Sequence, residues 1–332
     1  MALLKPLSPS NNKETTMTYS SGGLIQATDY NGFVSTTVGA NVNATWNSTY
    51  GQTALSTVST AGTVTATQWA SLVNTVTNMA AHQPTTITSR AAPTTGTTIS
   101  VLAAVNTDIT NCFTNRYNAY AQGAQFTGWT GTNSKTAATS GATWTITFTN
   151  TVTFANATAA TNFFNSGGTV KIDVSKNNTG ATGDPEWNDL ANNLCGDIYI
   201  SGLATSHTIA SVAYTGTTKI GGTGTPTTLS TGTGWDALVA GAAGTIVYKQ
   251  FADTAPYTSN FIQHTIAKGA ASTTLVITTL WSASDGDPIS GGTAPSGATP
   301  GTAPCTIVTY YPPETTYLTS SWGTPTVAAT TV

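Results

Sequence analysis

Residues 143–175 hold the pattern that most constrains the fold of this chain. In their first part, apolar side chains alternate with Thr and Asn at nearly every second position, as in a strand with one buried face: Trp144, Ile146, Phe148, Val152 and Phe154. The alternation stops at residues 156–165, which we interpret as a short helix that turns two phenylalanines inward and ends at a Gly-Gly pair. A second alternating run at residues 170–174 predicts another strand. The segment is therefore predicted to be a compact strand–helix–strand unit.

Two amphipathic helices are predicted before this unit. The first begins at Thr65, where a hydroxyl followed three residues later by Gln68 has the spacing of a capping box, and it ends near Pro84. The second is expected over residues 100–123, and two amphipathic helices joined by about seventeen residues predict a helical hairpin with Trp69 buried at the contact. The apolar stripes are Trp69, Leu72, Val73, Val76 and Met79, then Leu102, Val105, Ile109, Phe113, Tyr117 and Tyr120.

After the unit, short strand patterns and Gly/Thr-rich loops predict a sandwich of antiparallel sheets. A helix is expected to begin at Asp184, because Pro185 suits the first helical position. We therefore predict a β-rich α+β protein with an antiparallel β-sandwich-like C-terminal region and an N-terminal helical hairpin. The strand-like runs are residues 198–200, 208–213, 245–251, 261–267, 273–280 and 305–311, and the main loops are 216–234 and 284–301.

The chain divides into four predicted parts. Residues 1–22 have low complexity and no apolar pattern of their own, which indicates an N-terminal arm. Residues 23–123 form the helical hairpin region, and residues 124–142 are a linker rich in Gly, Thr and Ser. Residues 143–332 form the β-rich sandwich domain.

The chain carries little charge. Charged residues make up 7% of it, whereas soluble proteins usually have about 25%. Such surfaces suit packing into an assembly or exposure outside a cell. The ten Lys and Arg residues form no cluster and the net charge is −3, so we expect no nucleic-acid partner. No apolar run is long enough to insert in a membrane, and the start lacks the core of a signal peptide, so synthesis in a cytoplasm is expected.

Motifs for catalysis are missing from the sequence. Three cysteines, Cys112, Cys195 and Cys305, have no metal-ligand spacing and are expected to be buried free thiols. Three histidines lie far apart, and His82 is interpreted as a helix-end residue, where a cation is mildly favoured. No nucleophile elbow, phosphate loop, dinucleotide fingerprint or zinc motif occurs. We expect no enzyme activity and no cofactor.

The carboxylates give two weak alternatives. Asp184, Glu186 and Asp189 form an acidic group, but a helix start explains all three. Asp285 and Asp287 could ligate calcium through loop oxygens, although a solvated turn is the favoured interpretation, so no metal is expected. A glycosidase pair of carboxylates far apart in the sequence stays open as an alternative.

Aromatic residues in or beside loops are the candidate binding residues: Trp129, Trp235, Trp281, Trp322, Tyr310 and Tyr311. Exposed rings in polar loops are typical of protein and carbohydrate interfaces. The alternative is that these rings anchor the loops into the core.

Several stretches, in order along most of the chain, resemble a family of virion structural proteins of tailed bacteriophages, including phages of cyanobacteria and marine bacteria. They are residues 17–31, 50–52 (Tyr-Gly-Gln), 64–73, 82–83 (His-Gln), 163–168, 311–317 and 321–323 (Ser-Trp-Gly). The similarity begins at Met17, so residues 1–16 resemble an added arm. No catalytic residues come with these motifs.

The resemblance implies a structural subunit of the virion, associated with the tail as a fibre, baseplate or adaptor component. Its partners would be copies of itself, with a homotrimer expected by analogy with fibre subunits, other tail or neck proteins, and a glycan of the host cell surface. Two alternatives stay open: a capsid decoration or cement protein, and a tail-associated polysaccharide depolymerase.

Overall fold

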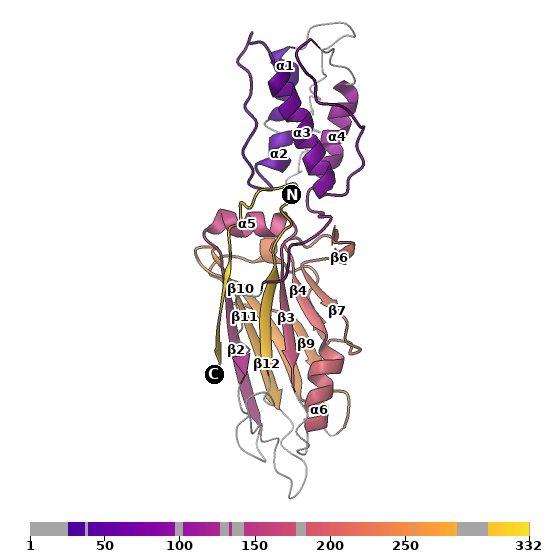
Figure 1. Ribbon diagram of the computed structural model, residues 1–332. Helices are drawn as coiled ribbons and strands as arrows, with labels where there is room; N and C mark the ends of the chain where they lie inside the picture. The colour runs from indigo at the N-terminus through magenta and orange to yellow at the C-terminus, as the bar shows by residue number, and fades with distance from the viewer. Residues whose placement is uncertain are drawn as a thin grey trace, which may run out of the picture.

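The structure of the protein is a computed structural model that describes residues 26–36, 39–96, 102–126, 133–134, 143–176, 184–255, 257–283 and 305–331. The predicted arm at residues 1–22, Trp129, Asp285 and Asp287 lie outside the described residues. Figure 1 shows a helical region stacked end to end on a β-sandwich, so that the molecule is elongated along the strand direction. The predicted domain boundaries stay a prediction.

The helical region contains four described helices: α1 (Ala27–Val34), α2 (Val42–Trp46), α3 (Ala66–His82) and α4 (Leu102–Thr114). The predicted start of α3 is confirmed, because Gln68 N donates to the Thr65 hydroxyl at 3.2 Å and Thr65 N donates to Gln68 Oε1 at 2.9 Å. Trp69 is buried, as expected. Its aromatic neighbours belong to α1, with ring centroids 6.1 Å from Tyr30 and 5.8 Å from Phe33.

Helix α4 is shorter than predicted. It ends at Thr114 rather than Gly123, so Tyr117 and Tyr120 lie beyond the helix. The backbone after it bonds to distant parts of the chain instead of continuing the helical ladder. Ala119 N donates to the Thr208 carbonyl at 2.9 Å, and Tyr120 N donates to the His82 carbonyl at 2.7 Å.

The sandwich contains two antiparallel sheets, which confirms the predicted fold class. One has six strands in the order β13 (Thr326–Thr331), β2 (Trp144–Thr153), β11 (Thr274–Ala283), β10 (Phe261–Lys268), β9 (Thr245–Phe251) and β8 (Thr228–Leu229). The other has five, in the order β1 (Asn133–Ser134), β12 (Cys305–Tyr311), β3 (Thr169–Ser175), β4 (Asp197–Ile200) and β7 (Thr217–Ile220).

The strand–helix–strand unit joins the two sheets. Its strands β2 and β3 belong to different sheets, and helix α5 (Ala157–Asn165) lies across one end of the sandwich between them (Figure 1). Asn156 caps α5 by accepting from Ala159 N at 2.8 Å. Gly167 follows with φ +95°, and a Cβ there would lie 2.6 Å from the Ala119 Cβ, so this turn requires glycine. The unit therefore closes the core at the end that faces the helices.

Three parts of the sandwich differ from the sequence-based expectation. The strand expected at residues 208–213 is a hairpin of β5 (His207–Ile209) and β6 (Val212–Tyr214), turned by Ala210 and Ser211 at positive φ. The loop expected at residues 216–234 contains β7 and β8, and β13 was not predicted. These strands are short, or rich in Thr and Ala, and they depend on pairing with longer neighbours.

The helix predicted at Asp184 is present as α6 (Asp184–Asp189), which continues into a π-helix, η1 (Leu190–Cys195). A short 3₁₀ turn, η2 (Trp235–Ala237), packs against α5. The buried apolar side chains of the helical region and of the sandwich form one continuous cluster, from Tyr30 to Trp322. The hydrophobic core thus continues from one part of the molecule into the other.

Candidate functional site

The helical region and the sandwich meet at a junction built from polar side chains. Gln52 Nε2 donates to the Thr319 carbonyl at 2.8 Å and to the Tyr50 carbonyl at 3.0 Å. Its Oε1 accepts from Thr319 N at 2.9 Å and from the Thr319 hydroxyl at 2.6 Å. Ser321 Oγ donates to the Tyr50 carbonyl at 2.6 Å. These hydrogen bonds therefore join Gln52 to Thr319, 267 positions away in the sequence, and Tyr50 to Ser321, 271 positions away.

Tyr50 is the centre of this junction. Its hydroxyl donates to the Arg116 carbonyl at 2.6 Å and accepts from Gln83 Nε2 at 2.7 Å. Its ring meets that of His82 edge to face, with centroids 5.1 Å apart. Burial raises the pKa of Tyr50 far above its ordinary value, so the phenol stays neutral and acts as a structural hydrogen-bonding group.

Gly51 lets the two parts approach each other. Its φ is +66°, and a Cβ at this position would lie 1.9 Å from Asn162 Nδ2 and 2.9 Å from Ser321 Oγ. A side chain would therefore separate α5 and the 321 segment from the helical region.

A second set of contacts lies where the chain passes from the helical region into the sandwich. Gln122 Nε2 donates to the Gly167 carbonyl at 2.8 Å and to the Thr169 hydroxyl at 3.0 Å. Asn118 Oδ1 accepts from Thr208 N at 2.9 Å. The rings of Tyr120 and Tyr317 lie 5.4 Å apart. The junction is thus fixed by both backbone crossings and side-chain bonds.

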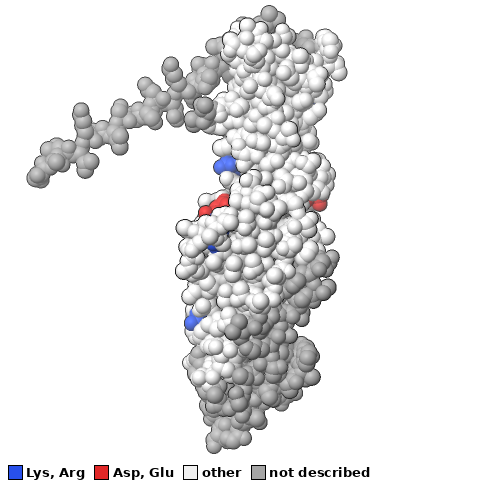
Figure 2. All heavy atoms as spheres, turned by 90° about the vertical axis from the view of Figure 1, so that its left-hand side faces the viewer, with Lys and Arg blue, Asp and Glu red and all other residues white. Residues whose placement is uncertain are grey.

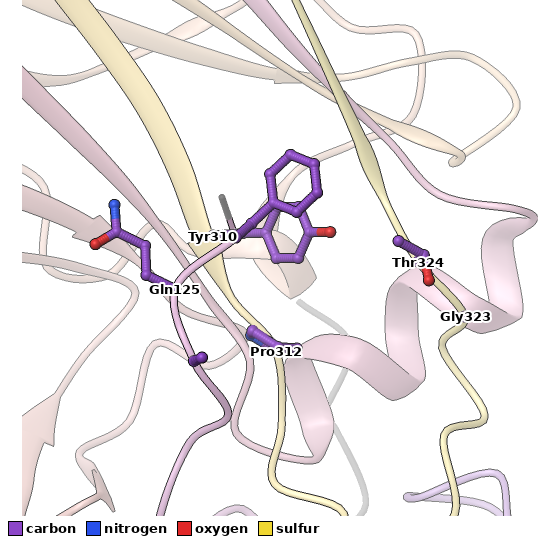
Figure 3. A pocket seen from close by; sticks show the side chains of 7 residues that line it. Gln125, Tyr310, Pro312, Gly323 and Thr324 are labelled. Carbon is purple, nitrogen blue, oxygen red and sulfur yellow. The ribbon is translucent and has the colours of Figure 1, made fainter. Parts of the chain in front are cut away.

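A surface pocket of about 370 Å³ lies next to the junction, between the end of β12 and the segment that leads into β13 (Figure 3). Phe126 N donates to the Tyr310 carbonyl at 2.9 Å and Gly123 N to the Pro312 carbonyl at 2.8 Å, so residues 123–126 run beside the end of β12. In Figure 3, Gln125 lies on one side, Gly323 and Thr324 on the other, and Tyr310 between them. The lining residues are Ala124, Gln125, Phe126, Tyr310, Pro312, Gly323 and Thr324.

The pocket has the chemistry of a binding site for neutral groups. The rings of Phe126 and Tyr310 stack at 4.5 Å, and the Tyr310 hydroxyl donates to the Pro325 carbonyl at 2.9 Å. Burial raises the pKa of Tyr310 to about 12, so the described residues that line the pocket hold no charge at neutral pH. The Gln125 amide is its main polar group, and its Oε1 accepts from the Tyr311 hydroxyl at 3.1 Å. Among the described residues that line the pocket, there is no Cys, His, Lys, Asp or Glu side chain.

Most of the candidate binding aromatics are core residues, which agrees with the alternative that they anchor the core and not with exposed binding rings. Trp235, Trp281, Trp322 and Tyr310 are each at most 2% exposed. Trp235 stacks on Phe164 at 5.2 Å, and Trp281 Nε1 donates to the Thr306 hydroxyl at 3.4 Å. Trp281 lies within β11 and Tyr310 within β12, both at positions that face the core rather than in loops. Tyr310 lines the pocket at its base, and Tyr311 is partly exposed beside it.

The pocket residues that the sequence analysis missed are Ala124, Gln125, Phe126, Pro312, Gly323 and Thr324. They come from three segments that are distant in the sequence. No local pattern marks them, because the pocket exists only once residues 123–126 align with β12.

The three histidines are buried and neutral. Burial lowers the pKa of His82 to about 4 and that of His264 to about 3, and it also lowers the pKa of His207. His82 is the last residue of α3, as expected, but it is not a cation there, because its ring is completely enclosed at the junction.

Asp184 and Glu186 lie in the first turn of α6, whereas Asp189 is its last residue, and Glu186 is buried. Burial raises the pKa of Glu186, and the charges of Asp189 and Asp253 raise it further. Asp189 Oδ1 accepts from Asn193 Nδ2 at 2.7 Å, which ties it to its own helix. Within the described residues, no three His, Cys, Asp or Glu side chains gather as a metal site.

The three cysteines are free thiols, as predicted. Burial raises the pKa of Cys112 and of Cys195 to about 12 each, so both are unreactive at neutral pH. Cys305 is partly exposed on the outer face of β12 rather than buried.

Comparison with protein family models, with curated proteins and with solved structures finds no match to this chain. Among the described helices, none combines the length and the apolar character that a membrane crossing requires.

Proposed function

We propose that this protein is a structural subunit of a tailed-bacteriophage virion, associated with the tail as a fibre, baseplate or adaptor component. It acts by assembly with other subunits and by contact with the host surface rather than by catalysis.

The observation that carries the proposal is the position of the motifs that resemble virion proteins. The Tyr-Gly-Gln, His-Gln and Ser-Trp-Gly stretches lie far apart in the sequence but supply Tyr50, Gln52, Gln83 and Ser321 to one junction. These side chains bond to each other and to backbone groups. The residues that carry the resemblance therefore hold the helical region and the sandwich together, and this structural role supports the proposal of a structural subunit.

Shape and charge give further support. The molecule is elongated, and the side of it that carries β13 and β2 is almost free of coloured Lys, Arg, Asp and Glu atoms where residues are described (Figure 2). A free protein usually needs surface charge for solubility, whereas a subunit covers such surfaces with its neighbours. The uncharged pocket beside Tyr310 offers a site for a neutral host glycan.

The test is to locate the protein in the particle. Antibodies raised against the purified chain are applied to purified virions in negative-stain electron microscopy, and copy number is measured by quantitative mass spectrometry. Label on the tail, at a few tens of copies, is expected. Label spread over the head would establish a decoration protein instead, and absence of the chain from washed virions would contradict both.

A further inference from the structure

The outer face of the six-stranded sheet has a composition unlike that of ordinary exposed sheets. The outward positions of β2 are all threonine: Thr145, Thr147, Thr149, Thr151 and Thr153. The register places Thr274, Val276, Thr278 and Leu280 of β11 beside them, then Gln263, Thr265 and Ala267 of β10, and Thr326, Ala328 and Thr330 of β13 on the other side. We call these positions the threonine face.

The threonine face is nearly free of charge. Among the described outward positions of the sheet, the ionisable side chain is Lys249 of β9. Its ammonium lies 3.7 Å from the ring centre of Phe261 and 4.5 Å from that of Phe251, toward the β9 edge of the sheet. The outward side chains of β2 are partly or fully exposed. The centre of the face therefore presents hydroxyl, methyl and isopropyl groups.

The opposite sheet shows that the chain does place charge on strands. On the outer face of the five-stranded sheet, Lys171 Nζ lies 3.4 Å from Asp197 Oδ2 and 3.7 Å from Asp173 Oδ2. Charged outward side chains are what keeps exposed β-sheets from associating. The outer face of the five-stranded sheet therefore carries charges that oppose association, whereas the described positions of the threonine face carry almost none.

We propose that the threonine face packs against the same face of a second copy of this chain, about a two-fold axis. An uncharged face meets itself without repulsion, which an isologous contact requires. Five long strands at a spacing of about 4.8 Å and a length of about 30 Å give roughly 700 Å². Specific interfaces bury about 600–1,000 Å² per partner, so the face is of adequate size.

The side chains suit such packing. Two sheets stack face to face about 10 Å apart when their side chains interdigitate. Threonine and valine are branched at Cβ and hold few rotamers, so they lose little conformational entropy when covered. Threonine hydroxyls can also bond across the contact, which an alanine surface could not do.

The test measures the mass of the full chain in solution by light scattering during size-exclusion chromatography, at about 10 µM, where a contact of this size is populated. We expect a dimer. In the double variant Thr149→Lys/Thr278→Lys, cross-strand neighbours at the centre of the face bring four ammonium groups together in a dimer, so we expect a monomer.

The matched control is Thr208→Lys/Ala213→Lys, a cross-strand pair that is exposed on the β5–β6 hairpin and should leave the dimer intact. Circular dichroism checks that each variant is folded. If the lysine pair unfolds the chain, Val276→Thr/Leu280→Thr replaces it and should raise the dimer dissociation constant at least about tenfold.

A monomeric wild-type chain, or a dimer that the lysine pair leaves unchanged, would overturn this proposal. A trimer whose mass the lysine pair does not change would also overturn it and would favour the homotrimer implied by the resemblance. The measurement uses the isolated chain, so its outcome is independent of whether antibodies find the protein on virion tails.

Discussion

In the folded protein, the surroundings of His264 keep its imidazole in the neutral form. Its ring is completely buried, stacks on Tyr248 with centroids 5.3 Å apart, and has Nδ1 3.0 Å from the Thr279 hydroxyl. Burial lowers its pKa to about 3. The unfolded chain regains the ordinary value near 6.5, so below that pH it binds a proton that the folded chain refuses.

The stability of the protein should therefore fall as the pH drops from about 6.5 toward 3. For His264 alone, the free energy of unfolding should be about 2 kcal/mol lower at pH 5 than at pH 7. Urea unfolding at the two pH values measures this difference, and His264→Gln should reduce it by about that amount. An unchanged difference in the variant would show that the ring is protonated in the folded state.

The junction can be tested at Gly51. Gly51 and Gly323 have the same φ of +66°, but a Cβ at Gly51 meets Asn162 and Ser321, whereas nothing lies within 4 Å of one at Gly323. Both alanine variants carry the strain of positive φ, about 1 kcal/mol, and Gly51→Ala adds overpacking of about 1–3 kcal/mol. Thermal and urea unfolding of the two variants gives the comparison. Equal losses of stability in the two variants would mean that the junction accommodates the added methyl group without a further loss of free energy.

Between elements, the strongest local prediction concerns Trp69 in the contact of α3 with α1. The ring is 2% exposed and lies against Tyr30 and Phe33. Trp69→Ala should lower the free energy of unfolding by about 3–5 kcal/mol, because it leaves a cavity in the helical region. Asn74→Ala, at an exposed position of the same helix, should change it by less than about 0.5 kcal/mol. A loss below about 1 kcal/mol for Trp69→Ala would mean that the neighbouring side chains move in and fill the cavity.

Elements with strong local signals were predictable from the sequence. The alternation of Trp144, Ile146 and Phe148 predicted β2, and Thr65 with Gln68 predicted the start of α3, because both signals lie within one element. The end of α4 was not predictable, since Tyr120 N takes its partner from His82. The hairpin turn at Ala210 and Ser211 lacks the Gly or Asn that usually marks such turns.

The candidate site was less predictable than the fold. Aromatic residues near loops carry no local signal of which side faces the core, so the sequence left Trp235 and Trp281 open between a binding role and core anchoring, and both are buried. The pocket and the junction depend on contacts across some 180 to 270 positions, such as Tyr311 with Gln125 and Gln52 with Thr319. Periodicity within a window of residues cannot reveal them.

For the whole molecule, we predict that the purified protein does not degrade host surface glycans. A retaining or inverting glycosidase needs a proton donor and a second carboxylate held across a cleft. Burial raises the pKa of Glu186, and the charges of Asp189 and Asp253 raise it further, but Glu186 does not line the pocket, and the described lining residues include no carboxylate. The assay is incubation with host envelope polysaccharide and detection of new reducing ends. Release of sugar that disappears in Glu186→Gln would make the protein a depolymerase.

The segment between β12 and β13 has a mechanical consequence. It leaves the five-stranded sheet, bonds to Gln52 and Tyr50 through Thr319 and Ser321, and returns into the six-stranded sheet. Tension on the helical end therefore reaches both sheets at once, through this segment and through the covalent path at residues 118–126. The strands run along the same long axis, so their hydrogen bonds are loaded together in shear rather than opened one after another (Figure 1). An elongated protein joined in this way can transmit a pull along its length without separating its two parts.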